Sequence, residues 1–360
     1  MRVVIAPDGF GGTLAADEAA AAIAAGWRRV RPQDDLVPVP MSDGGEGLAR
    51  AVATRDDRWR STEVAGPHGH PVEAAWLLRA DGTALVESAA ACGLHLVPAD
   101  RRDPMLATTY GVGQLLEAVR RSGVRRVVVG LGGSATVDGG SGALGGLGFR
   151  VTVANGSGLR VGGDDLQRVA GVSRGWSGDW RGIQVVLLAD VTTPLTHAAA
   201  VFGPQKGASP SQVAELTAAL AAWADVVARD LTPGRDLRRE PGSGAAGGLG
   251  FALAAAIGAR FAPGAAAVAE LVGLPAAVGD ADLVVTGEGR LDATTRAGKV
   301  VAHVTALGTR ADVPVLAVVG QVGPDAPALA DVEAAAPDGP GDDPAAEVAA
   351  AASRLAARSG

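Results

Sequence analysis

The chain has 360 residues and a net charge of −7 at pH 7, and 48% of its residues are hydrophobic although only 3% are aromatic. This length favours two domains, and the negative charge argues against a nucleic-acid or anionic-membrane surface. No apolar run approaches the roughly 18 residues that would span a bilayer. The N-terminus lacks a secretory pattern, and the single Cys92 cannot form an intrachain disulfide. We expect a cytoplasmic protein.

Short apolar runs rich in β-branched residues predict six strands, most of them without polar alternation, as in parallel sheets covered on both faces. The runs are 3–6, 36–39, 127–129, 184–189, 283–285 and 313–319. Helical patterns with start and stop signals predict the helices between them. These are 13–30, 48–54, 113–122, 211–229 and 345–358. The alternation of strands and helices predicts an α/β fold.

Connectors rich in Gly and Pro suggest where domains begin and end. They lie at 66–71, 232–250 and 337–344. We predict two dissimilar α/β domains. Residues 1–65 with 255–360 would form a discontinuous, doubly wound, Rossmann-like domain, and residues 66–254 a second α/β domain with a glycine-rich phosphate-binding loop.

Five of the predicted strands are followed by acidic residues, most of them beside glycine. These acids are Asp8, Asp43, Glu46, Asp138, Asp190, Glu288 and Asp292. Because ligands in open α/β sheets bind beyond the carboxyl ends of strands, the pattern predicts a functional cluster. Ordinary turn chemistry is the alternative, since Asp and Gly are common turn residues.

Lysine is rare in this chain: of 32 basic residues, only Lys206 and Lys299 are lysines, each beside a glycine. A compact ammonium group does work that the planar guanidinium of Arg does not always replace. We therefore expect at least one of the two lysines to be functional. The alternative is chance survival on a solvated loop.

The stretch GLGGSATVDGGSG (130–142) directly follows a predicted buried strand. Gly132 and Gly133 can expose backbone N–H groups to phosphate, with the hydroxyls of Ser134 and Thr136 as further donors. Carboxylates suit Mg²⁺ bound together with phosphates, and a lysine suits a transferring phosphoryl group. These features together favour phosphoryl transfer over a permissive turn.

Standard signatures of other classes are absent or out of context. The chain has no GxxxxGK[ST], because Val300 follows Lys299, and no GxGxxG after its first strand. A nicotinamide-dependent oxidoreductase would be expected to carry the second fingerprint. Residues 171–175 match GxSxG, but a nucleophile elbow needs a helix after it, and here GWSGDW and then a predicted strand follow, so we interpret the match as chance.

Eight segments, taken in order along almost the whole chain, resemble the bacterial glycerate kinase family. They are 5–20, 40–47, 87–98, 101–116, 130–148, 202–209, 244–253 and 286–300. The resemblance implies an ATP-dependent kinase that phosphorylates D-glycerate, with two dissimilar α/β domains and the active site in the cleft between them. The chain departs from the family in Gly11, where Lys is usual, in Ser42, where Ala is commoner, and in a shorter segment at 192–203.

Site roles follow from the resemblance as hypotheses. The predicted catalytic residues are Asp190 (the leading general base, or an Mg²⁺ ligand), Lys206 and Asp8. The predicted nucleotide-binding residues are Gly132, Gly133, Ser134, Thr136, Asp138, Gly139 and Gly140. The predicted substrate-binding residues are Ser42, Asp43, Gly44, Gly45, Glu46, Arg290 and Lys299, and the predicted metal ligands are Asp190 and Glu288.

Three questions stay open at this stage. The 2- and 3-hydroxyl groups of glycerate are equally compatible with the sequence, and the oligomeric state is open, including a homo-oligomer. A kinase for another small hydroxy acid and a non-catalytic relative that binds a nucleotide or an acid are the alternatives. We expect a small hydroxy acid and a nucleotide as the partners.

Overall fold

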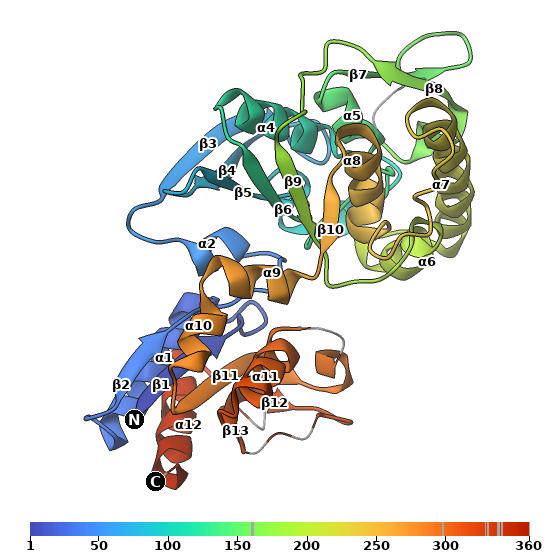
Figure 1. Ribbon diagram of the computed structural model, residues 1–360. Helices are drawn as coiled ribbons and strands as arrows, with labels where there is room; N and C mark the ends of the chain where they lie inside the picture. The colour runs from blue at the N-terminus through green and yellow to red at the C-terminus, as the bar shows by residue number, and fades with distance from the viewer. Residues whose placement is uncertain are drawn as a thin grey trace. The chain divides into compact units, whose positions relative to one another are not determined.

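The computed structural model describes residues 1–159, 162–296, 299–327, 329, 331–336, 339 and 341–359. Residues 337, 338 and 340 of the predicted linker and residues 297 and 298 of the last family-like segment lie outside this set. The chain divides into two compact units (Figure 1). The first comprises Met1–Val52 and Pro263–Gly360, and the second comprises Ala53–Ala262.

The first unit contains a five-stranded sheet in which every pair of neighbours is parallel. Its strands are β1 (Arg2–Pro7), β2 (Asp35–Pro38), β11 (Leu283–Leu291), β12 (Val315–Val322) and β13 (Val332–Ala334). Their order in space is β13-β12-β11-β1-β2. The strand order therefore runs outward in both directions from the β1–β11 pair, which makes this pair the switch point of a doubly wound sheet.

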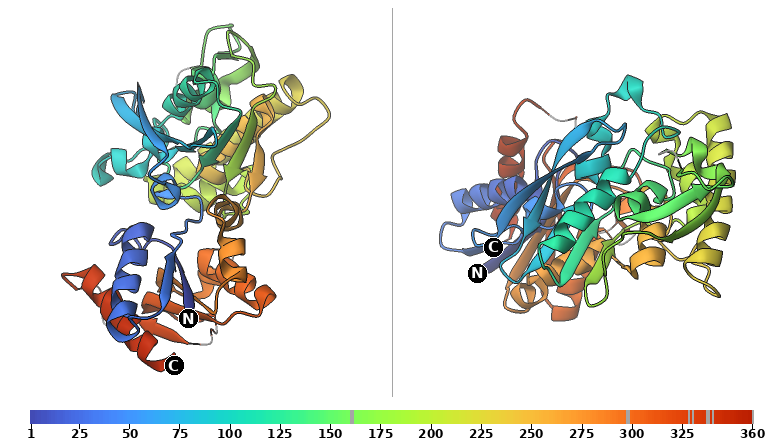
Figure 2. Two further views of the ribbon diagram at one scale, coloured as in Figure 1. Left: turned by 60° about the vertical axis from the view of Figure 1, so that its left-hand side comes forward. Right: turned by 90° about the horizontal axis from the view of Figure 1, so that it is seen from above.

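Helices cover both faces of this sheet. The helices of the unit are α1 (Ala16–Val30), α2 (Leu48–Val52), α9 (Gly264–Leu271), α10 (Leu274–Gly279), α11 (Val300–Ala311) and α12 (Pro344–Arg358). Helix α1 joins β1 to β2, and α11 joins β11 to β12. The two connections therefore step toward opposite edges of the sheet. Right-handed crossovers then place them on opposite faces, and α12 packs beside α1 (Figure 2).

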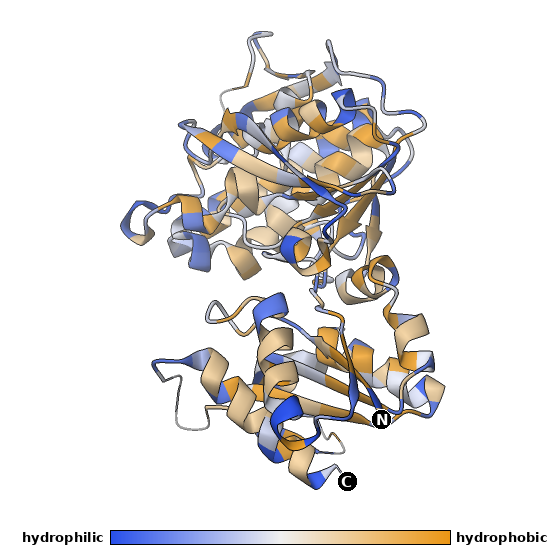
Figure 3. Cartoon of the chain, turned by 90° about the vertical axis from the view of Figure 1, so that its left-hand side faces the viewer, coloured by the Kyte–Doolittle hydropathy of each residue, from blue (hydrophilic) through white to orange (hydrophobic). Residues whose placement is uncertain are grey.

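Small aliphatic residues and one tryptophan fill the core of the first unit. Ile5, Ile23, Trp27 and Leu355 are fully buried between the sheet and the α1–α12 pair. The indole N–H of Trp27 donates to Asp34 Oδ2 at 3.0 Å, so its polar atom is satisfied. Figure 3 shows hydrophobic colours along much of the sheet of the first unit.

The second unit contains a six-stranded mixed sheet. Its strands are β3 (Arg58–Ala65), β4 (Pro71–Leu78), β5 (Thr83–Glu87), β6 (Arg126–Gly130), β9 (Gln184–Leu188) and β10 (Arg260–Ala262), in the order β10-β9-β6-β5-β4-β3. Strands β5, β6, β9 and β10 are parallel, whereas β3 and β4 form an antiparallel hairpin at the edge. The predicted connector at 66–71 is the turn of this hairpin, where Gly66 N donates to His70 O.

Hairpin pairing explains why the unit boundaries differ from the expected ones at 65 and 255. Strand β3 pairs along its whole length with β4, so residues 58–65 belong with the second sheet. At the other end β10 pairs with β9, which keeps the chain in the second unit up to Ala262. Each boundary falls between a helix or strand of one unit and the next element of the other.

Helices and a small two-stranded sheet complete the second unit. The helices are α3 (Ala89–Cys92), α4 (Tyr110–Arg121), α5 (Ser141–Gly146), α6 (Ala198–Phe202), α7 (Pro210–Asp230) and α8 (Leu249–Ile257), and the small sheet pairs β7 (Phe149–Val153) with β8 (Val169–Arg174). Ser209 caps the N-terminus of α7: its side chain accepts from Gln212 N, which fixes the first turn of the helix.

The predicted α/β fold is confirmed, and all six predicted strands are present. One prediction needs correction in its extent. The acidic stretch at 286–292 is predicted to follow a short strand at 283–285, but β11 continues to Leu291 because Gly287, Glu288 and Arg290 still pair with β12. In the part of the chain that the structure describes, no helix has the length and apolarity needed to cross a membrane.

Candidate active site

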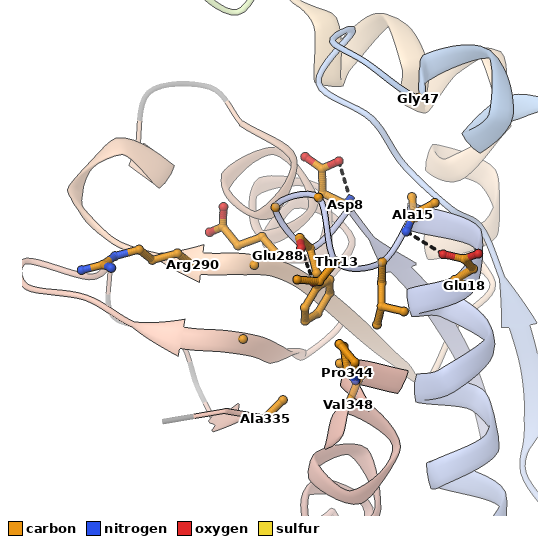
Figure 4. Close-up of a pocket in the computed structure, with 18 of the residues that line it drawn as sticks. Asp8, Thr13, Ala15, Glu18, Gly47, Glu288, Arg290, Ala335, Pro344 and Val348 are labelled. Atoms are coloured by element: carbon orange, nitrogen blue, oxygen red, sulfur yellow. Dashed lines mark hydrogen bonds between the residues drawn. The ribbon is translucent and has the colours of Figure 1, made fainter. Parts of the chain in front are cut away.

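The carboxyl end of β1 lies beside Gly287 of β11 at the switch point of the first sheet, and β11 continues from there to Leu291. Ligands in open α/β sheets bind in the crevice outside such a point. A cavity of about 900 Å³ opens there, and all of its lining residues belong to the first unit (Figure 4). The lining includes the predicted site residues Asp8, Ser42, Asp43, Glu46, Glu288, Arg290 and Lys299.

Asp8 is the first residue after β1 and is half-buried in this cavity. Its backbone N–H donates to Gly287 O of β11 at 2.8 Å, and its Oδ1 accepts from Gly9 N at 2.7 Å. Burial and the charges of Asp43 and Glu288 raise the pKa of Asp8 to about 7, although the Gly9 N–H and Lys299 oppose the shift. A carboxyl group with this pKa can exchange its proton near neutral pH, as general acid–base catalysis requires.

The loop 40–47 follows β2 and borders the same cavity. Met41 N donates to Pro7 O at 2.9 Å, which holds the loop against the end of β1. Gly44 N donates to Ser42 Oγ at 3.1 Å and Gly45 N donates to Asp43 Oδ1 at 2.9 Å. The two glycine N–H groups that were predicted to bind substrate therefore already have partners inside the loop.

Glu288 lies on β11, next to Asp8 across the switch point, and only 8% of its surface is exposed. Its Oε1 accepts a hydrogen bond of 2.6 Å from Thr295 Oγ1. Burial raises the pKa of Glu288; the Thr295 hydrogen bond and Lys299 oppose this, while Asp292 and Asp43 add to it. Figure 4 shows the Asp8 and Glu288 side chains on neighbouring segments at the same end of the sheet.

Two cationic side chains accompany these carboxylates. Arg290 extends along β11 away from Asp8 and Glu288 in Figure 4, and its side chain is 57% exposed, with Nε 3.5 Å from Asp292 Oδ2. Lys299 stands at the N-terminus of α11, and its positive charge opposes the rise in the pKa values of both Asp8 and Glu288 that burial causes. The cavity thus combines ionisable carboxyl groups with cations suited to an anionic ligand.

The glycine-rich stretch 130–142 joins β6 to α5 in the second unit, and Asp138 organises it from within. The Asp138 side chain is fully buried. Its Oδ2 accepts from the N–H and the hydroxyl of Thr109, both at 2.8 Å, and its Oδ1 accepts from Gly140 N at 3.0 Å. Burial raises the pKa of Asp138 against these hydrogen bonds. The carboxyl group ties the stretch to the start of α4.

Gly139 and Gly140 are packing glycines. Both have positive φ, 62° and 74°, and a Cβ on Gly139 would lie 2.5 Å from Trp223 Cδ1 while one on Gly140 would lie 2.5 Å from Ala252 Cβ. By contrast, Gly132 is half-buried and Gly133 is exposed. The surface of the stretch that a phosphate could reach is therefore its first part.

Lys206 is almost completely buried behind the same stretch, with 3% exposure. Its Nζ donates to Ser134 Oγ at 2.9 Å and to Thr136 O at 2.7 Å. Burial lowers the pKa of Lys206 to about 8, although the nearby Cys92 and Asp138 oppose the shift. The lysine joins the segment after α6 to the stretch after β6.

Asp190 follows β9 and is half-buried. Strands β9 and β6 are parallel neighbours in which Leu188 pairs with Gly130. Asp190 and the glycine-rich stretch therefore start from the same edge of the second sheet.

Comparison with known proteins identifies the family. The family model described as "Glycerate kinase family" matches residues 3–359. The chain belongs to the glycerate kinase family. It is 41% identical over 335 residues to "Glycerate kinase" from Bacillus subtilis (strain 168), covering 91% of this chain and 87% of that one. It is 39% identical over 331 residues to "Glycerate 2-kinase" from Escherichia coli (strain K12), covering 90% and 86%.

A solved structure supports the same family. The crystal structure described as a glycerate kinase 2 from Salmonella typhimurium LT2 matches with a TM-score of 0.87 and 38% identity, covering 99% of this chain and 97% of that chain. The predictions of the family and of an enzyme that phosphorylates glycerate are confirmed.

The donor set of the cavity suits the Mg²⁺ that the sequence predicts. Carboxylate oxygens such as those of Glu288 are the hard ligands that Mg²⁺ prefers, and Mg²⁺ bound with phosphates needs only one or two of them. Among the described residues, no three His, Cys, Asp or Glu side chains converge as a metal site.

Two threonines that hydrogen-bond to buried carboxylates were not predicted from the sequence. Thr295 bonds Glu288, and Thr109 bonds Asp138. Both stand in family-like segments, 286–300 and 101–116, so their place in those segments was a signal. Threonine has no spacing rule that marks it as the partner of a buried carboxylate, and Thr109 is 29 residues from Asp138.

Proposed function

We propose that the enzyme transfers the γ-phosphoryl group of ATP to the 2-hydroxyl group of D-glycerate, giving 2-phosphoglycerate and ADP. The observation that carries the proposal is the paired Asp8 and Glu288 at the switch point, in a cavity that also holds Arg290 and Lys299. The name of the Escherichia coli relative, "Glycerate 2-kinase", supports the choice of hydroxyl. A reaction that consumes ATP also supports the expected cytoplasmic location.

Asp8 is the general base in this proposal, with Asp190 as the competing assignment from the sequence. Asp8 has a pKa of about 7, close to the working pH at which a base is most effective. It would accept the proton of the attacking hydroxyl while the oxygen–phosphorus bond forms and the bond to ADP breaks. Phosphoryl transfer depends mainly on such positioning and on charge stabilisation.

The substrate carboxylate is assigned to the cationic side chains of the same cavity. Arg290 is exposed enough to reach an incoming acid and can bind a carboxylate through two parallel hydrogen bonds. Lys299 supplies a second positive charge beside Asp8. Ser42, Asp43 and Glu46 would then contact the hydroxyl groups of glycerate, since they line the cavity whereas the N–H groups of Gly44 and Gly45 are already used.

The nucleotide phosphates are assigned to the first part of the glycine-rich stretch. Gly132 and Gly133 offer accessible backbone there, and Lys206 holds Ser134 and Thr136 behind them. Glu288 of the first unit is the carboxylate assigned to Mg²⁺, with Asp190 of the second unit as the other candidate ligand from the sequence; the ion, when bound, would neutralise charge on the phosphates. Asp138, Gly139 and Gly140 support this stretch from inside in the proposal.

The decisive experiment is to incubate the purified enzyme with Mg·ATP and D-glycerate and identify the phosphoglycerate isomer by NMR. We expect 2-phosphoglycerate with stoichiometric formation of ADP. A panel of other small hydroxy acids tests the substrate class, and D-glycerate should give the highest kcat/KM. Formation of 3-phosphoglycerate would refute the choice of hydroxyl, and no consumption of ATP would favour a non-catalytic binding protein.

A further inference from the structure

Thr295 lies in the short turn Ala293–Arg296 that follows β11, and it is fully buried although it is polar. Its backbone N–H donates to Asp292 O at 3.1 Å, and its hydroxyl oxygen accepts from Asp292 N at 3.2 Å. The backbone and the side chain of one residue are thus both fixed to the end of the strand. The position of the Thr295 hydroxyl is therefore set by the turn.

The hydroxyl proton of Thr295 points toward the carboxylate of Glu288. Because the Thr295 oxygen accepts from Asp292 N, its own O–H points elsewhere, and it donates to Glu288 Oε1 at 2.6 Å. This length is typical of a hydrogen bond from a hydroxyl to an ionised carboxylate. Since a glutamate side chain has three rotatable bonds, one such bond at its tip removes much of its freedom.

We propose that Thr295 is a positioning residue that holds the Glu288 carboxylate in place at the switch-point cavity. This inference rests on the proposed function, in which Glu288 acts toward Mg²⁺ and the nucleotide. Residues that orient the ligands of a metal often matter almost as much as the ligands themselves. Thr295 is itself buried and touches neither substrate in this proposal. The same hydrogen bond also opposes the rise in the pKa of Glu288 that burial causes.

The test compares Thr295→Val, Thr295→Ser and the matched control Thr286→Val. Thr286 lies on β11, the strand that carries Glu288. It is fully buried, and its hydroxyl donates to Ala6 O at 2.9 Å. Thr286→Val therefore removes a buried hydroxyl hydrogen bond of similar kind without touching Glu288. Measurements are kcat and KM for both substrates, the calorimetric Kd for Mg·ADP without turnover, and the melting temperature.

We expect Thr295→Val to lower kcat roughly 10- to 100-fold and to weaken Mg·ADP binding about 10-fold, with KM for D-glycerate changed by less than about 3-fold. Thr295→Ser keeps the hydroxyl and should restore both values to within about 3-fold. Thr286→Val should lower the melting temperature while leaving kcat and the Kd within about 2-fold. Thr295→Cys, close in shape but a weak donor, replaces Thr295→Val if the latter does not fold.

Two results would overturn the inference in distinguishable ways. If Glu288→Gln impairs kcat and Mg·ADP binding but Thr295→Val, or Thr295→Cys in its place, leaves both within about 2-fold, Thr295 does not position Glu288 and the proposed function stands. If Glu288→Gln also leaves both unchanged, the role given to Glu288 in the proposed function fails, and the inference fails with it.

Discussion

Lys206 and Ser134 form a buried contact in the second unit, with Nζ of the lysine 2.9 Å from Oγ of the serine. The two residues are 72 positions apart in the chain. The same Nζ also donates to Thr136 O at 2.7 Å, so one ammonium group holds both sides of Ala135. Burying an ammonium group costs free energy unless the group is well hydrogen-bonded. The arrangement therefore favours a ligand-binding role for this loop over a purely structural one.

Lys206→Met should reduce kcat/KM for ATP by about 10- to 100-fold, because hydrogen bonds to charged groups contribute roughly 1.5–3 kcal/mol. Ser134→Ala should have a smaller effect, since Lys206 keeps its bond to Thr136 O. If Lys206 and Ser134 act as one unit, kcat/KM for ATP in the double variant should lie within about twofold of the value for Lys206→Met alone. Additive losses in this cycle, measured by steady-state kinetics, would mean that the two residues act independently.

Gly139→Ala should destabilise the protein by about 3 kcal/mol or more, because a methyl group overpacks the core and the positive φ adds strain. The clash is with the ring of Trp223, whose Nε1 donates to Gly139 O at 2.9 Å. Gly156→Ala is the matched control: its φ is 80°, but nothing lies within 4 Å of the added Cβ. That control should cost only about 1 kcal/mol. Urea denaturation of both variants measures the difference, and equal losses would contradict the packing role.

Much of the fold was predictable because buried parallel strands have an unambiguous sequence pattern. The runs that became β1, β6 and β9 are almost wholly apolar, and each is buried over most of its length. Strand β3, RWRSTEVA, was missed because it lies at the edge of its sheet and most of its residues are exposed. An edge strand need not carry a continuous apolar run, so its signal depends on the pairing with β4 that sequence alone does not reveal.

The candidate site was predictable only in part, for a related reason. Asp8 follows from the rule that ligands gather beyond strand ends. Glu288 was selected by the same rule although it lies within β11, and the structure brings both residues into one cavity. The rule does not say which polar groups are already used. Gly45 N is bonded to Asp43, and Asp138 is bonded to Thr109, and these contacts depend on loop geometry and on residues far away in the chain.

Asp8→Asn should lower kcat by roughly 10²- to 10⁴-fold if Asp8 is the general base, because this is the usual contribution of such a group. In the wild-type enzyme, kcat/KM should fall as the pH drops below about 7, since the raised pKa of Asp8 leaves the carboxyl group protonated there. Asp190→Asn serves as the comparison at the other candidate base. A wild-type profile that stays flat from pH 8 to about 5, or a larger loss of kcat in Asp190→Asn than in Asp8→Asn, would transfer the role to Asp190.

Asp8 should also make the protein less stable as the pH rises. Its pKa is about 7 in the folded state against an ordinary value of 3.8, so the folded state binds the proton more tightly than the unfolded state. The resulting stabilisation is fully present below the unfolded pKa and is lost as the pH rises through the folded pKa, a change on the order of 2–4 kcal/mol. Asp8→Asn, which is neutral at every pH, should therefore raise the melting temperature at pH 8 relative to wild type and lose most of this advantage near pH 4.

Asp56→Asn, at an exposed position in the turn before β3, controls for the general loss of a negative charge and should shift the melting temperature at neither pH. The measurement is thermal denaturation without Mg²⁺ or nucleotide, and an Asp8→Asn protein that is less stable than wild type at pH 8 would mean that the Asp8 carboxylate is stabilised, rather than strained, by its surroundings.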